Sequence, residues 1–96
     1  MFNIEKRRQA MLNCIDAIMS DPYMIAIKPE GDDKFYLTKN AYRLEIRDDN
    51  SSVWDSYVVL PNGNSDGDKY KEYLVNKYLD LVANSDPKHF HDEEEN

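Results

Sequence analysis

The sequence predicts a small single α+β domain, with an antiparallel sheet between an N-terminal and a C-terminal helix. Apolar residues recur every three or four positions over residues 4–20 and 68–83, which is the period of a helix packed on one side. Between these segments the period changes to two, as in strands with one face on the core and one in water. The order α-β-β-β-α places both helices on the apolar face of the sheet.

Residues 4–20 form the predicted first helix. Asn3 is in the position of an N-cap, and Asp21-Pro22 ends the helix because the residue before a proline avoids the helical conformation. Cys14 falls within the apolar stripe, so we expect a buried, unreactive thiol. The stripe consists of Ile4, Met11, Leu12, Ile15, Ile18 and Met19.

The strand pattern covers residues 23–28, 34–47 and 53–60, separated by turns at 29–33 and 48–52. Lys39-Asn40 is not a strong hairpin signal, so we favour an antiparallel three-stranded meander with a kink there. A turn at that point would give a four-stranded meander. With four strands the two turns lie at the same end of the sheet, and with three they lie at opposite ends.

Residues 68–83 form the predicted second helix. Ser65 followed by Asp68 resembles a capping box at its start, and Asn84 lies near its end. We expect the domain to span residues 1–86 and residues 87–96 to be a disordered acidic tail. The apolar stripe of this helix is Tyr70, Tyr73, Leu74, Tyr78, Leu81 and Val82.

Composition bounds the class of protein. A chain of 96 residues has room for one domain, and its single cysteine cannot form an internal disulfide. We identify no signal peptide and no apolar run of membrane-spanning length, and therefore expect a cytoplasmic protein. The net charge is −7, but four of the 19 acidic residues lie in Asp92–Glu95. Without these four, the chain has 15 acidic and 12 basic residues. The predicted domain is therefore only mildly acidic.

The segment Asn62–Asp68 resembles the start of a calcium loop. Counting from Asn62, the twelfth position is Tyr73 where such a loop needs a bidentate glutamate, and Glu72 is one residue early. We therefore predict a turn, with a metal-dependent role as a lesser hypothesis. His89 and His91, followed by Asp92, could bind a transition metal, but the tail offers no further ligand. We therefore expect no metal and no cofactor.

Catalysis is not expected either. Both histidines lie in the tail, so a Ser-His or Cys-His pair within the domain is excluded. The chain has three glycines, all in turns, and no glycine-rich phosphate loop. We predict a protein that is not an enzyme.

The remaining candidate features are acidic turns and aromatic residues on the predicted sheet. Spaced carboxylates can occupy the phosphate-binding surface of another protein, as a DNA mimic does. Exposed Tyr and Trp side chains are typical anchors of protein interfaces. The candidate partner-binding residues are Glu30, Asp32, Asp33, Tyr36, Asp48, Asp49, Trp54 and Tyr57.

These features favour a protein-binding module. Short acidic chains without a catalytic set are common among bacteriophage and mobile-element accessory proteins. Some of those inhibit a host nuclease, a restriction or CRISPR system, or a polymerase. We therefore expect the partner to be a host protein with a basic surface.

The alternative is a nucleic-acid-binding module that uses the polar face of the sheet. Basic groups beside an aromatic side chain can hold a single strand by charge and stacking. The residues concerned are Lys28, Lys34, Tyr36, Arg43 and Arg47.

Overall fold

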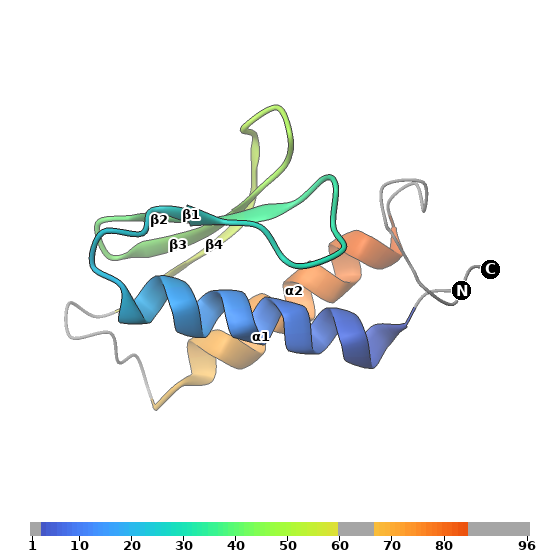
Figure 1. Cartoon of the computed structure of the whole chain (residues 1–96), viewed down its shortest axis with the longest axis horizontal. Coiled ribbons are helices and arrows are strands. Elements are labelled where there is room, and N and C mark those ends of the chain that lie inside the picture. The colour runs from blue at the N-terminus through green and yellow to red at the C-terminus, as the bar shows by residue number, and fades with distance from the viewer. Residues whose placement is uncertain (1–2, 60–66, 85–96) are drawn as a thin grey trace.

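The computed structural model describes residues 3–59 and 67–84, which form a helix, four strands and a second helix in that order. The strands pair in chain order, each antiparallel to the next (Figure 1). The predicted fold class is therefore confirmed, with four strands. The elements are α1 (Ile4–Ser20), β1 (Ala26–Ile27), β2 (Tyr36–Asn40), β3 (Arg43–Arg47), β4 (Val53–Val58) and α2 (Lys69–Ala83).

Both ends of α1 lie where the sequence predicts them. The Asn3 side chain accepts a hydrogen bond from the amide of Lys6 at 3.1 Å, and the helix ends before Asp21. Lys39 reaches from β2 to the carbonyls of Ile18 and Asp21, with distances of 2.7 and 2.9 Å from its Nζ. A cation at this end complements the negative pole of the helix dipole. Lys39 thereby ties α1 to the sheet.

The three-stranded sheet that we favoured is wrong, because the chain makes a tight turn at Ala41-Tyr42. Asn40 pairs with Arg43, so β2 and β3 form a hairpin with a two-residue loop. Such loops favour glycine or asparagine because they require a positive φ, and here Ala41 takes that conformation with φ of 55°. The register compensates, since it sets Leu37 opposite Ile46 on the buried face.

Four strands bring the two acidic turns to one end of the sheet. The loop over residues 28–35 joins β1 to β2, and the loop over residues 48–52 joins β3 to β4. In an antiparallel meander these alternate connections lie at the same end, and the turn at residues 41–42 lies at the other.

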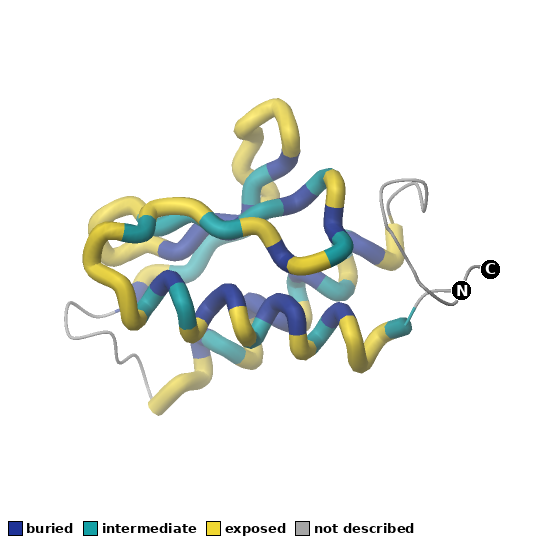
Figure 2. The backbone as a smooth tube through the Cα atoms, in the orientation of Figure 1, coloured by how far each residue is buried: buried dark blue, intermediate teal, exposed yellow. Residues whose placement is uncertain are grey.

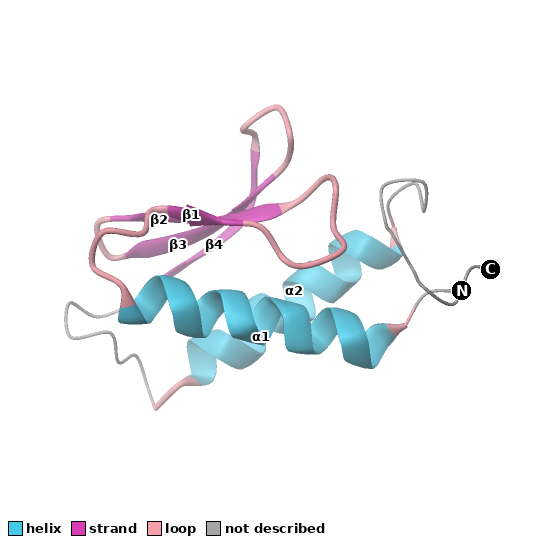
Figure 3. Ribbon diagram, viewed as in Figure 1, coloured by secondary structure: helices cyan, strands magenta, loops and turns pink. Residues whose placement is uncertain are grey.

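The core lies between the sheet and the two helices, which cover the same face (Figures 2 and 3). α1 packs under β1 and β2, α2 packs under β4, and the helices contact each other. Each fully buried apolar side chain contributes roughly 1.5–3 kcal/mol to the stability of the fold. The central side chains are Met11, Ile15 and Ile18 of α1, Leu37, Leu44 and Ile46 of the sheet, and Leu74 and Tyr78 of α2.

The start of α2 differs from the prediction. The N-cap is Asp68, which has a φ of 70° and makes no side-chain cap hydrogen bond. Its carboxylate lies 4.0 Å from Lys71 instead. Ser65 lies outside the described residues, and so do residues 62–66 of the calcium-loop resemblance. The predicted tail, residues 87–96, also lies outside them. Neither described helix is both long enough and apolar enough to cross a membrane.

Candidate functional site

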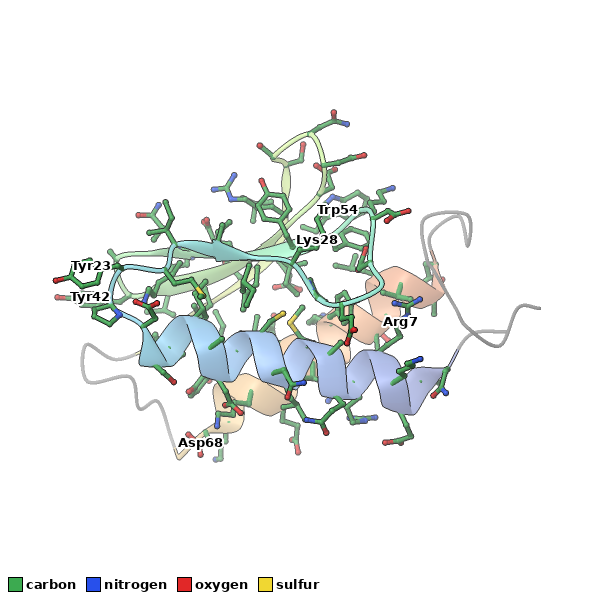
Figure 4. All side chains as sticks on the ribbon, viewed as in Figure 1. Arg7, Tyr23, Lys28, Tyr42, Trp54 and Asp68 are labelled. Atoms are coloured by element: carbon green, nitrogen blue, oxygen red, sulfur yellow. The ribbon has the colours of Figure 1, made fainter. Side chains whose placement is uncertain are left out.

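The two acidic loops and the aromatic residues beside them form one surface, which we call the loop end. It comprises residues 28–36 and 48–54. In Figure 4, Lys28 and Trp54 lie toward this end of the sheet, whereas Tyr23 and Tyr42 project from the opposite end. Lys28 of the first loop and Asp49 of the second line the same shallow hollow beside β1, together with Ala26 and Tyr36.

Asp32 holds the first loop in place from inside the fold. It is only 3% exposed, and its carboxylate accepts hydrogen bonds from the amides of Lys34 and Phe35, at 2.7 and 2.9 Å. The hydroxyl of Tyr78 donates to its other oxygen at 2.7 Å. Burial, followed by the nearby Asp32 carboxylate, raises the pKa of Tyr78 far above its usual range, so this hydroxyl remains a donor. Asp32 therefore supports the surface from beneath.

Asp48 has the same role in the second loop. It is 7% exposed and accepts from the amides of Asn50 and Ser52, at 2.9 and 3.0 Å. The indole Nε1 of Trp54 donates to it at 2.8 Å. The bond from Trp54, and then that from Ser52, hold the pKa of Asp48 below its ordinary value of 3.8. The carboxylate is ionised at neutral pH and fixes the orientation of the indole.

Three of the predicted carboxylates are exposed, namely Glu30, Asp33 and Asp49. The two loops together contain five carboxylates and two lysines, Lys28 and Lys34. The loop end is therefore acidic overall, with its negative charge spread over both loops.

The aromatic part of the loop end is Trp54 with Tyr36. Trp54 is 49% exposed, and its ring meets the buried ring of Phe35 edge to face, with centroids 5.8 Å apart. The Nζ of Lys34 lies 5.7 Å from the Trp54 ring centroid, within the range of a cation–π contact. The hydroxyl of Tyr36 lies 3.3 Å from that of Ser51, which links β2 to the second loop. Trp54 is thus an exposed aromatic side chain in a fixed position.

Tyr57 does not belong to this surface. Its ring packs against Tyr73 and Tyr70 of α2, with centroid distances of 5.0 and 6.5 Å. A register shift between β3 and β4 separates the two aromatic residues, because Ile46 pairs with Asp55 and Arg47 pairs with Val53. Trp54 lies at this bulge, so strict alternation does not hold along β4.

Most residues of the alternative hypothesis lie at the loop end: Lys28, Lys34 and Tyr36 belong to it, and Arg47 pairs with Tyr36. Arg43 instead follows the turn at the opposite end and donates to Ser56. Arg47 forms an ion pair of 2.8 Å with the buried Glu45 and donates to the carbonyl of Ser51. Internal contacts therefore hold both arginines on the polar face.

A polar cluster between β4 and α2 was not predicted from the sequence. Asp55 accepts hydrogen bonds from its neighbour Ser56 and from the hydroxyl of Tyr73, the latter at 2.9 Å, and lies 3.8 Å from Lys77. The bond to Asp55 raises the pKa of Tyr73. The one available signal was an acidic residue at a core-facing position of the strand.

Cys14 is buried, as predicted. Burial, and next the Asp32 carboxylate, raise the pKa of its thiol to about 11, so it is protonated at neutral pH and is a poor nucleophile. Within residues 3–59 and 67–84 no group of three or more His, Cys, Asp or Glu side chains is placed to hold a metal ion.

Comparisons with protein-family models, with curated proteins and with solved structures found no match for this chain.

Proposed function

We propose that this protein is a non-enzymatic protein-binding module that inhibits a host nucleic-acid-binding protein through the acidic loop end. The observation that supports this proposal most directly is the position of both acidic loops at one end of the sheet, beside Tyr36 and the exposed Trp54. Interfaces of this kind combine an aromatic anchor with surrounding charges that set the partner and the rate of association.

The partner class follows from the charge. A surface with carboxylates on two rigid loops attracts a basic groove, and the groove of a nuclease, restriction enzyme, CRISPR effector or polymerase is basic because it binds phosphates. Asp32 and Asp48 fix the loops before binding, which lowers the entropy cost of forming the complex. Accessory proteins of bacteriophages and mobile elements are the class in which we place this chain.

The test is affinity capture from a nuclease-treated bacterial lysate with the wild-type chain and two variants. Glu30→Lys with Asp49→Lys reverses two exposed charges of the loop end. Glu72→Lys with Asp80→Lys makes the same change in net charge on the exposed side of α2. We expect the wild type and the α2 variant to retain one stoichiometric partner that binds DNA or RNA. The loop variant should bind that partner at least about tenfold more weakly.

Salt provides the second readout. Raising the salt concentration from about 0.1 to 0.5 M should release the partner, because it screens the charges at the interface. Equal capture by the two charge-reversed variants would contradict the proposal. A salt-sensitive shift of a labelled oligonucleotide by the purified chain, lost in Arg43→Glu with Arg47→Glu, would favour the nucleic-acid alternative instead.

A further inference from the structure

The two edge strands of the sheet, β1 and β4, differ in whether their outward backbone N–H and C=O groups have hydrogen-bond partners. β4 is the edge beside α2, and the amide of Ser56 at its centre is taken by the Asp55 carboxylate at 2.8 Å. The same strand contains the bulge at Trp54. Bulges and blocked amides are devices that keep an edge strand from pairing with another chain.

The β1 edge has neither a bulge nor an occupied outward amide; its protections are its length of two residues and the Lys28-Pro29 that follows it. The amide of Lys39 donates to the carbonyl of Ile25 at 2.9 Å, so Ile25 and Ile27 have their backbone groups turned toward β2. Antiparallel pairing alternates, which turns the N–H and C=O of Ala26 and the N–H of Lys28 outward. Within the described part of the chain no group hydrogen-bonds to these three. They form a short row of unused donors and acceptors along the edge.

The side chains beside this row are apolar and exposed. Tyr23 is 91% exposed and Ile25 is 69% exposed. Tyr42, at the same end of the sheet in Figure 4, is also exposed. Tyr23 lies in the turn after α1 and Ile25 directly precedes β1, so exposed apolar side chains flank the start of the β1 edge.

Acidic groups lie at the other end of β1. Asp49 lines the hollow over Ala26 and Lys28, and Glu30 follows two residues after Lys28. The adjoining loops contain two lysines, Lys28 and Lys34, and three exposed carboxylates, Glu30, Asp33 and Asp49. An added strand would thus meet apolar side chains near Ile25 and net negative charge near Lys28.

We propose that the β1 edge accepts an extended segment of the partner as a fifth strand, with apolar side chains facing Ile25 and basic side chains facing the acidic loops. Strand addition uses the outward groups of Ala26 and Lys28 for affinity and the flanking side chains for specificity. This inference rests on the proposed function, because the charges that attract the partner are those of the loop end.

The probe is a pair of nine-residue peptides, one alternating Lys with Val and one alternating Glu with Val, titrated into the ¹⁵N-labelled full chain. The Lys–Val peptide should shift the amide signals of residues 24–28, and the Glu–Val peptide should leave them unchanged. Shifts confined to residues 53–58 of β4, or no shift with the Lys–Val peptide, would overturn the inference.

Two matched variants test the backbone directly. Ala26→Pro removes an outward N–H without breaking a bond of the sheet, and proline is accepted at such edge positions. Ala26→Thr keeps the N–H. We expect Ala26→Pro to bind the Lys–Val peptide about tenfold more weakly than Ala26→Thr. Equal affinities would overturn the inference. Ile25→Lys keeps every backbone group and should also weaken binding, which provides an arm that does not depend on the proline variant folding.

The same peptide separates failure of this inference from failure of the proposed function. Binding that is lost in Glu30→Lys with Asp49→Lys but equal in Ala26→Pro and Ala26→Thr would support the acidic loop end and reject the added strand. Binding that is lost in Ala26→Pro but unchanged by the charge reversal would support the strand and reject the acidic contact.

Discussion

At the scale of single residues, the acidic side chains of the two loops have two different roles. The carboxylates of Asp32 and Asp48 are buried and accept hydrogen bonds from within the fold, whereas Glu30 and Asp49 are exposed. A carboxylate that accepts backbone hydrogen bonds fixes the loop around it. The buried pair therefore determines where the exposed carboxylates lie.

Asp48→Asn tests this role through its pH dependence. The native pKa of Asp48 lies below the unfolded value, so its contribution to stability is present above about pH 4 and is lost as the pH falls through the native pKa. We expect the variant to melt at a lower temperature than wild type at neutral pH. The gap should shrink between about pH 5 and pH 2. Thermal melts across that range check this, and a gap independent of pH would contradict it.

The buried and exposed acids could not be distinguished in the sequence. The runs Asp32-Asp33 and Asp48-Asp49 each present two adjacent acids, and one of each pair is turned inward. A signal existed in the tendency of Asp to accept from an amide two residues on, which both Asp32 and Asp48 do. The donors Tyr78 and Trp54 come from other elements, and no local pattern predicts them.

At the scale of elements, one hydrogen bond joins the first acidic loop to α2. Tyr78 donates to Asp32 across 46 positions of the sequence, within the core. This contact couples the position of the loop to the packing of the helix.

Tyr78→Phe removes that donor and leaves the aromatic ring in place. We expect a loss of about 1–2 kcal/mol in the free energy of unfolding, because the buried Asp32 carboxylate keeps its two amide donors and loses the third. Tyr23→Phe is the matched control, since Tyr23 is exposed and its change should stay within about 0.5 kcal/mol. Urea denaturation measures both, and equal stabilities for the two variants would contradict the role of the bond.

The sequence allowed the fold class and both helices to be predicted, together with the caps of α1 at Asn3 and Asp21. Helical periodicity and proline are strong local signals. The hairpin at Ala41-Tyr42 was not predicted, because it uses alanine where glycine or asparagine is usual. The bulge that separates Trp54 from Tyr57 leaves only a less regular alternation over residues 53–60, which does not locate it. Both features arise from pairing between strands, which is set by the whole sheet.

At the scale of the whole molecule, the strand count decides whether a single acidic surface exists. With the turn at residues 41–42, the loops over residues 28–35 and 48–52 lie at one end, as the four-strand alternative requires. The site that we propose is thus a consequence of topology, with Tyr36 and Trp54 placed between the loops.

The most direct measurement is hydrogen–deuterium exchange of the captured complex against the free chain. We predict slower exchange on binding over residues 24–36 and 48–54, which contain the β1 edge and both acidic loops. The exposed side of α2, around Glu72 and Asp80, should exchange as in the free chain. Protection confined to either helix, with the two loops unchanged, would show that the partner does not bind at the loop end.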